Sequence, residues 1–227
     1  MNWSSFEEVV KVLEKEKKIY NIFKDCPYHI LKNVKLRKYP QGNFRLEQGE
    51  VYDKFYILVD GEVDIFIVSD SGKKYYVSSY GKGYFIGELE LFDRNAYMSL
   101  VVGRGTVTTL EMDRETYLEW LQCDHNFNQY VLKILCSRTY NSMRKMGNDT
   151  LYTLKQRICQ HLVAETIDKG KKTATINVEV LGERMGVTSR SVNRILKELK
   201  DKEILEISNS KVVILDEKQL LKENNER

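Results

Sequence analysis

The chain of 227 residues contains only 4 cysteines and 3 histidines, which is too few and too scattered for the common metal centres. The cysteines Cys26, Cys123, Cys136 and Cys159 include no CxxC pair, whereas iron–sulfur and structural zinc sites use thiolates at short spacing. No histidine falls within residues 34–112, so a metalloenzyme of the cupin type lacks its ligands. We therefore expect neither a metal nor a cofactor, and we interpret the cysteines as reduced structural thiols.

Long apolar runs are also missing. The run FYILV at 55–59 is far shorter than the ~20 residues that cross a bilayer, and the start MNWSSFEEVV lacks the features of a signal peptide. We expect a cytoplasmic protein without membrane contact. The GxxxxGK[ST] and GxSxG patterns are absent as well, and we predict that the protein is not an enzyme. The net charge of +3 is small, so a nucleic-acid site must be a local concentration of arginine and lysine.

Residues 34–112 consist of short apolar runs separated by glycine-containing turns, a texture typical of a β-sandwich or barrel. The segments VDGEV and SDSGKK predict hairpins that turn at 60–61 and 71–72. Before them, FEEVVKVLEKEKK has apolar residues at helical spacing and a serine cap at residues 4–5. This pattern predicts a helix near residues 5–18.

The segment from residue 113 onward predicts one short helix followed by a long one. On the long helix Phe127, Val131, Ile134 and Leu135 form an apolar stripe at helical spacing. The stripe can pack on the barrel or form the seam of a two-stranded coiled coil, and we favour the dimer seam.

The continuation of this stripe is interrupted by Arg138 and Asn141, polar residues that need partners. Turn residues at 147–149 then predict a hinge. Beyond the hinge, the sequence predicts a helix whose apolar face begins at Leu151 and which ends at Gly170.

The segment NVEVLGERMGVTSRSVNRILKELK carries the most specific signal of the sequence. Asn177 can cap a helix that runs through Arg184, Gly186 can form a left-handed turn, and Thr188 can cap a second helix. Two short helices at this spacing predict a helix-turn-helix. The apolar face of the second helix consists of Val192, Ile195, Leu196 and Leu199.

The second helix of such a motif enters the major groove of DNA, where arginine reads guanine, asparagine reads adenine, and serine and lysine hold phosphates. The segment ILEISNSKVVIL follows as two β-runs joined at 209–210, which predicts a wing. A solvated helix face and a winged helix that contacts only proteins are the alternatives. The predicted DNA-binding residues are Thr188, Ser189, Arg190, Ser191, Asn193, Arg194, Lys197 and, at the tip of the wing, Lys211.

The chain resembles the cyclic AMP receptor protein/FNR (Crp/Fnr) family of bacterial transcription regulators over nearly all of its length. The resemblance rests on GELELF at 87–92, ILVDGEV at 57–63 and the helix VTSRSVNRILKELK, while FIGELEL is similar to a divergent branch, the YeiL regulators. It implies an α+β fold with a jelly-roll β-barrel of the cyclic-nucleotide-binding type, a long dimerisation helix and a winged helix-turn-helix. The corresponding domains are 1–112, 113–148 and 149–227. It further implies a homodimer on palindromic double-stranded DNA, with RNA polymerase as a candidate partner.

In family members that bind a cyclic nucleotide, the resemblance implies that a short helix after GELELF faces the phosphate and that an arginine pairs with it. Tyr97 stands at that arginine's position, and Arg94 lies three residues earlier. Because tyrosine cannot neutralise a phosphate, we expect a small effector other than cyclic AMP, with thiol sensing or an effector-independent barrel as alternatives. The candidate effector-binding residues are Gly87, Glu88, Leu89, Arg94, Tyr97 and Ser142.

Overall fold

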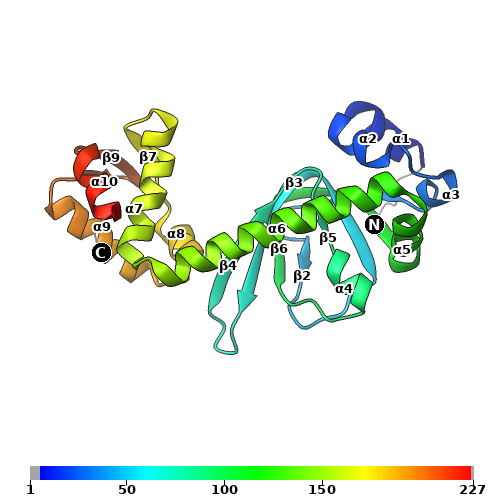
Figure 1. Cartoon of the computed structure of the whole chain (residues 1–227), viewed down its shortest axis with the longest axis horizontal. Coiled ribbons are helices and arrows are strands. Elements are labelled where there is room, and N and C mark those ends of the chain that lie inside the picture. The colour runs from blue at the N-terminus through cyan, green and yellow to red at the C-terminus, as the bar shows by residue number, and fades with distance from the viewer. Residues whose placement is uncertain (1–5, 226–227) are drawn as a thin grey trace. The chain divides into compact units, whose positions relative to one another are not determined.

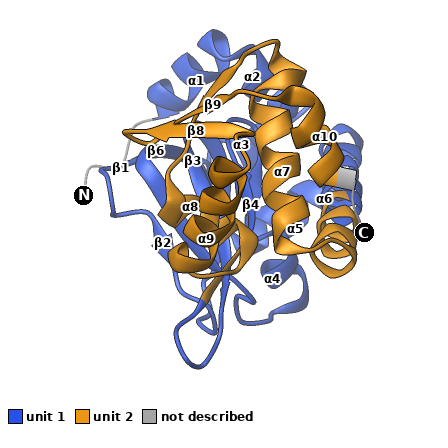
Figure 2. Cartoon of the chain, turned by 90° about the vertical axis from the view of Figure 1, so that its left-hand side faces the viewer, with its two compact units in different colours: residues 1–73, 77–140 blue, residues 74–76, 141–227 orange. Residues whose placement is uncertain are grey.

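The computed structural model describes residues 6–225, which fall into two structural units (Figure 2). Among the described residues, unit 1 contains 6–73 and 77–140, and unit 2 contains 74–76 and 141–225. In the part of the chain that is described, no helix has both the length and the apolar character needed to cross a bilayer.

Unit 1 is built around a sheet in the order β1-β6-β3-β4, in which β6 pairs antiparallel with both β1 and β3 (Figure 1). β2 adds to β6 and β5 adds to β3. The interior between these strands is filled by large side chains, among them Phe44, Tyr56, Leu58 and Val107. The strands are β1 (Lys35–Tyr39), β2 (Arg45–Leu46), β3 (Lys54–Val68), β4 (Lys74–Tyr80), β5 (Phe85–Ile86) and β6 (Leu100–Asp113).

The hairpin predicted at 60–61 is wrong, because β3 continues through these residues as one strand. The register between β3 and β6 shifts on either side of Asp60, as in a β-bulge. Gly61 has φ of 82°, and a Cβ there would lie 2.3 Å from the carbonyl oxygen of Thr106. Glycine is therefore required for a bend with close backbone contact, which a sequence pattern does not distinguish from a turn.

The second predicted hairpin, at 71–72, is confirmed as the connection between β3 and β4. The N–H of Gly72 donates to the carbonyl of Ser69 at 2.8 Å, and Gly72 has φ of 78°. The left-handed conformation suits glycine, so the sequence signal and the geometry agree.

Helices cover one side of the barrel in unit 1. The predicted helix near 5–18 is two helices, and the serines at 4–5 lie outside the described residues. Trp120 stacks on Phe127 with 3.6 Å between ring centroids and lies 4.6 Å from the ring of Phe23, so these helices share one core. The helices are α1 (Phe6–Lys15), α2 (Lys17–Phe23), α3 (Tyr28–Leu31), α4 (Glu88–Asp93), α5 (Arg114–Cys123) and α6 (His125–Leu151).

The apolar stripe of α6 faces the barrel and is not a dimer seam. Phe127, Val131 and Ile134 are buried in the core of unit 1, and Leu135 packs against the same core. The preference for a seam was wrong because periodicity identifies a buried face without identifying what covers it. A second row of side chains on α6 is exposed and is described below.

The hinge predicted at 147–149 is also wrong, since α6 remains helical to Leu151. The break lies at residues 152–153, where Thr153 caps the next helix and Gln156 completes a capping box. Leu151, predicted on the apolar face of that helix, is instead the last residue of α6 and is 79% exposed. One glycine among helix-forming residues costs about 1 kcal/mol, which neighbouring turns can offset.

Unit 2 contains the predicted helix-turn-helix, formed by α8 and α9 (Figure 1). Its three-stranded sheet has the order β7-β9-β8, with β7 before the helix-turn-helix in the chain and β8 and β9 after it. Its core is formed by the buried faces of α7 and α9, including Ile158, Leu162, Val192 and Leu199. The elements are α7 (Leu154–Glu165), a 3₁₀ turn (Ile167–Lys169), β7 (Thr173–Thr175), α8 (Val178–Met185), α9 (Ser189–Asp201), β8 (Leu205–Ser208), β9 (Lys211–Ile214) and α10 (Glu217–Asn225).

Candidate functional site

The turn between α8 and α9 has the geometry that the sequence predicts. The side chain of Asn177 accepts hydrogen bonds from the N–H groups of Glu179 at 2.9 Å and Val180 at 3.1 Å, which starts α8. Gly186 ends α8 with φ of 68°. The four apolar residues predicted on α9 are all buried, so the orientation of its opposite face is fixed.

Two predicted DNA-binding residues also form the start of α9. The hydroxyl of Thr188 accepts from the N–H of Ser191 at 3.3 Å and lies 3.1 Å from the hydroxyl of Ser191. Ser189 and Ser191 are half-buried, while Thr188 is exposed. The cap orients the first turn of α9, where a recognition helix approaches base edges.

The exposed face of α9 presents Arg190, Asn193, Arg194 and Lys197 to solvent. Within residues 6–225, none of these four side chains forms an ion pair or a hydrogen bond. Their donors are therefore free to contact an outside ligand. Free guanidinium, amide and ammonium groups on one helix face match the donor pattern of base edges and phosphates.

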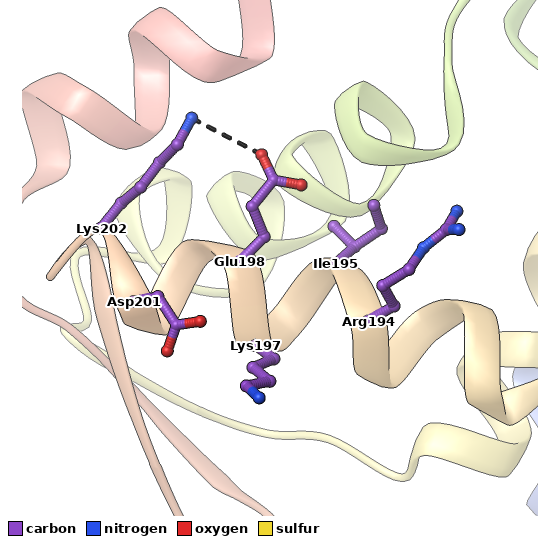
Figure 3. A pocket seen from close by; sticks show the side chains of 6 residues that line it. All are labelled: Arg194, Ile195, Lys197, Glu198, Asp201 and Lys202. Carbon is purple, nitrogen blue, oxygen red and sulfur yellow. Dashed lines mark ion pairs between the residues drawn. The ribbon is translucent and has the colours of Figure 1, made fainter.

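A shallow groove along α9 shows where this positive face ends (Figure 3). Lys197 and Asp201 project to one side of the helix, and Glu198 and Lys202 project to the other. The ammonium of Lys202 lies 3.5 Å from a carboxylate oxygen of Glu198. Because carboxylates repel phosphates, the groups suited to DNA lie on the part of α9 that ends at Lys197.

The hairpin of β8 and β9 confirms the predicted wing. Asn209 and Ser210 have φ of 47° and 63°, the two left-handed residues of a type I′ turn. The N–H of Ile176 donates to the carbonyl of Ser210 at 2.7 Å, which ties the turn to the body of unit 2. Lys211 follows the turn and is exposed, and its side chain forms no ion pair or hydrogen bond among the described residues.

We use the word cradle for the part of the barrel that contains the candidate effector-binding residues Gly87, Glu88 and Tyr97. It is built around Gly87, which precedes α4. The expectation of a short helix after GELELF is wrong, because the motif itself forms α4 from Glu88 to Asp93. Gly87 has φ of 96°, and a Cβ there would lie 2.7 Å from the hydroxyl oxygen of Tyr97 and 2.8 Å from the carbonyl oxygen of Lys54. Only glycine fits this approach, and Tyr97 fills the adjoining space.

Tyr97 is held rigidly inside the barrel. Its N–H donates to the carbonyl of Glu50 at 2.9 Å, and its carbonyl accepts from the N–H of Gly49 at 2.7 Å. The side chain is 2% exposed, and its ring meets that of Tyr52 edge to face at 5.2 Å. The hydroxyl has no hydrogen-bond partner in the described part of the chain. The assignment of Tyr97 to the position of the phosphate-binding arginine stays a prediction from the family resemblance, and the structure shows a buried phenol at this residue.

Glu88 is already paired within unit 1. The guanidinium of Arg138, on α6, forms an ion pair with its carboxylate and also donates to the carbonyl of Phe85. The same guanidinium lies 4.1 Å from the centre of the Tyr80 ring. In the sequence, Arg138 is recognisable only as an interruption of an apolar stripe. The signal that could have located its partner is the buried glutamate of GELELF, which requires a cation.

Two acidic side chains, Glu88 and Glu90, lie close to Tyr97. Burial raises the pKa of Glu88, against the influence of Arg138, and burial also raises the pKa of Glu90. Burial and the nearby carboxylate of Glu90 raise the pKa of Tyr97, which stays a neutral phenol. The guanidinium of Arg138 is already paired with Glu88, so it is not free to anchor a phosphate.

The remaining candidate effector residues, Leu89, Arg94 and Ser142, are exposed. Leu89 is 50% exposed, and Arg94 is an exposed residue with φ of 57° that ends α4. Ser142 is exposed on α6 in unit 2. Their participation in effector binding stays a prediction.

Cys26, Cys123 and Cys159 lie in surroundings that disfavour a reactive thiolate. Burial raises the pKa of Cys26 to about 12 and that of Cys159 to about 11. Desolvation also raises the pKa of Cys123, although its side chain is exposed. Reactive cysteines need a stabilised thiolate, which these surroundings disfavour. Among the described residues, no group of three or more histidine, cysteine or acidic side chains is arranged to hold a metal ion.

A β-barrel followed by a long helix and a winged helix-turn-helix defines a class of DNA-binding transcription regulators. Residues 36–124 match the model of the cyclic nucleotide-binding domain, and residues 156–223 match that of the Crp-like helix-turn-helix domain. The chain belongs to the Crp/Fnr family of transcription regulators, which are not enzymes. This membership removes the alternative of a winged helix that contacts only proteins.

The similarity to known proteins extends over most of the chain. The cAMP-activated global transcriptional regulator CRP of Salmonella typhimurium is 26% identical over 192 residues, covering 81% of this chain and 91% of its own. The c-di-GMP-responsive global regulator CLP of Xanthomonas campestris has a TM-score of 0.72 at 17% identity, covering 88% of this chain and 99% of its own. A Crp/Fnr-family regulator from Eubacterium rectale has a TM-score of 0.72 at 15% identity, covering 90% and 98%.

Proposed function

We propose that this regulator is a homodimer that binds a pseudo-palindromic operator through two winged helix-turn-helix units. The observation that carries the proposal is the exposed, unpaired set Arg190, Asn193, Arg194 and Lys197 on α9. Lys211 on the wing adds a phosphate contact beside the recognition helix. Thr188, Ser189 and Ser191 contribute the first turn, from which hydroxyl groups reach the DNA backbone.

A second copy of the chain accounts for the exposed row of α6. Leu132, Met143 and Met146 are 49%, 60% and 64% exposed, and Cys136 and Thr139 are exposed between them. Their spacing alternates between three and four residues, which is the pattern of a two-stranded coiled coil. This row is separate from the stripe that faces the barrel. Large apolar side chains in one line along a helix favour a helix of the same kind as the partner.

The effector of the barrel is proposed to be a small molecule other than cyclic AMP. The Salmonella relative is named for activation by cAMP and the Xanthomonas protein for its response to c-di-GMP, so effectors differ among proteins of this fold. In this chain Tyr97 replaces the expected anchor, and Glu88 is already paired with Arg138. Placement in a branch similar to the YeiL regulators, contact with RNA polymerase and a cytoplasmic location are further parts of the proposal.

Two experiments test these statements. Selection from a pool of random DNA duplexes should enrich an inverted repeat, and Arg190→Ala or Arg194→Ala should weaken binding to it. Failure of both substitutions to lower the affinity contradicts the assignment of the recognition helix. Calorimetric titration with cyclic AMP and cyclic GMP should give no binding heat at millimolar nucleotide, and micromolar binding contradicts the assignment of the effector.

A further inference from the structure

The last helix of unit 2, α10, places a buried carboxylate between two other helices. Glu223 is 2% exposed although it lies near the end of the chain. Its carboxylate forms an ion pair with Lys155, in the first turn of α7. The other carboxylate oxygen lies 2.5 Å from the ammonium of Lys202, the residue that ends α9. A buried carboxylate is costly without such partners, so its position is specific.

The two lysines share a second carboxylate, that of Glu198 on α9. Lys155 lies 2.8 Å from Glu198, and Lys202 lies 3.5 Å from it. Two ammonium groups and two carboxylates therefore alternate around a closed cluster that joins α7, α9 and α10. Removal of the Glu223 carboxylate leaves two ammonium groups with one carboxylate, so the repulsion between the two ammonium groups is no longer compensated.

The cluster lies toward the C-terminal end of α9, one helical turn beyond Arg194, which projects to the same side as Glu198 (Figure 3). Glu198 and Lys202 project to one side of the helix, while Lys197 projects to the other (Figure 3). The Thr188 cap fixes the beginning of α9, and the apolar residues Leu199 and Ile204 are buried near its end. The ion pairs thus hold the last turn of the helix without occupying the groups suited to DNA.

We propose that α10 is a clamp on the recognition helix and that Glu223 is a positioning residue for operator specificity. The proposal rests on the proposed function, because it takes α9 as the element that reads base edges. Hydrogen bonds to bases demand exact orientation, whereas phosphate contacts tolerate small shifts of a side chain. A recognition helix freed at its end loses specific affinity and keeps non-specific affinity.

The test compares Glu223→Gln, which removes the charge but keeps the shape, with Glu217→Gln, the same change at an exposed position of α10. Affinities are measured for the duplex that the wild-type protein selects and for a scrambled duplex, at a temperature where circular dichroism shows both variants folded. Glu223→Gln should reduce the ratio of the two affinities about tenfold, as expected for one weakened base contact. Glu217→Gln should leave the ratio unchanged.

If the ratio of the affinities for the selected and the scrambled duplex is the same in Glu223→Gln as in the wild-type protein, the clamp is refuted, whatever the change in melting temperature. An equal loss of specific and non-specific affinity overturns it as well, since that result indicates a general loss of binding. Lys202→Gln provides the second variant if Glu223→Gln does not fold, because the Lys202 side chain is 42% exposed. It should lower the ratio in the same direction.

Hydrogen exchange separates failure of the clamp from failure of the proposed function. Backbone amides at 197–202 should exchange about tenfold faster in Glu223→Gln than in the wild-type protein, with those of α8 unchanged, because local opening follows local stability. Unchanged exchange at 197–202 contradicts the clamp without any DNA. If the wild-type protein selects no sequence, the proposed function fails, and the exchange result still decides whether α10 holds α9.

Discussion

The guanidinium of Arg138 and the carboxylate of Glu88 form a buried ion pair that joins α6 to the start of α4 within unit 1. The two residues are 50 positions apart, and their side chains are 14% and 4% exposed. Glu88 belongs to the motif that carries the family resemblance, and its carboxylate is satisfied from within the chain. The connection between the cradle and the long helix is therefore present without any ligand.

Replacing Arg138 by methionine should destabilise unit 1 by roughly 3–5 kcal/mol, because the change leaves the Glu88 carboxylate buried and uncompensated. Denaturant unfolding monitored by fluorescence measures the loss. Arg144→Met, at an exposed position of the same helix, is the control and should change the stability by less than about 0.5 kcal/mol. Equal stability of Arg138→Met and the wild-type protein contradicts a structural role for the pair.

Tyr97 stands at the position where the family resemblance predicts a phosphate-binding arginine. Tyr97→Arg should increase the affinity of the barrel for cyclic AMP at least tenfold, because a guanidinium beside the start of α4 can pair with a phosphate. Calorimetry of the folded variant measures the change. The control is Arg94→Ala, which should leave nucleotide affinity unchanged. Measurable binding to the wild-type protein that disappears in Arg94→Ala would show instead that Arg94 is the anchor.

Base and phosphate contacts should respond differently to substitution. Arg194→Ala should cost about 1–3 kcal/mol on the selected operator and relax the preference at one base position. Lys211→Ala should weaken binding to all sequences and reduce the slope of affinity against salt by about 1. Fluorescence anisotropy at several salt concentrations distinguishes the two patterns. If Lys211→Ala leaves the slope of affinity against salt unchanged, the proposed contact between the wing and DNA is contradicted.

The dimer should depend on the exposed row of α6 and not on the stripe that packs on the barrel. Met143→Glu places two like charges across the seam, and sedimentation should then show a monomer. The matched change Asn141→Glu lies off the row and should leave the dimer intact. A dimer that survives Met143→Glu refutes this assignment of the seam.

The ion pairs of unit 2 should make its stability dependent on acid. Burial opposes ionisation of Glu223, but its hydrogen bonds to Lys155 and Lys202 outweigh burial and lower its pKa. Hydrogen bonding to Lys155 likewise lowers the pKa of Glu198. A glutamate whose pKa is lower in the folded than in the unfolded protein stabilises the folded state at pH values above its unfolded pKa, which is about 4.3. This contribution is lost as the pH falls through the pKa of the folded state.

Thermal unfolding between pH 7 and pH 3 measures this dependence. The melting temperature of unit 2 should fall below about pH 4.5, and the fall should be smaller in Glu223→Gln, which has one fewer group to protonate. An identical pH profile in the variant contradicts the assigned pKa. Glu217→Gln is again the control, because its carboxylate has no ion-pair partner among the described residues.

The recognition module was predictable from the sequence because its signals are local. The Asn177 and Thr188 caps, the Gly186 turn and the apolar face of α9 each involve residues within a few positions, and the structure confirms them. The wing was predictable for the same reason, since its turn needs two adjacent left-handed residues. Patterns that involve only neighbouring residues therefore predict the backbone geometry of caps and turns.

The errors lie where partners are distant in sequence. Gly61 looked like a turn because the carbonyl of Thr106 that crowds it lies on another strand. The stripe containing Val131 looked like a seam because periodicity does not show that the barrel covers it. The partner of Arg138 and the cluster around Glu223 both join separate helices, and no local pattern indicates them.

The most direct test of the central claim is selection of operators from random duplexes by the full-length protein, followed by affinity measurement at several salt concentrations. The account predicts an inverted repeat with half-sites about 34–36 Å apart, or a multiple of one helical turn, and an affinity that falls steeply with salt. Enrichment of no sequence, or binding that is indifferent to salt, would contradict it.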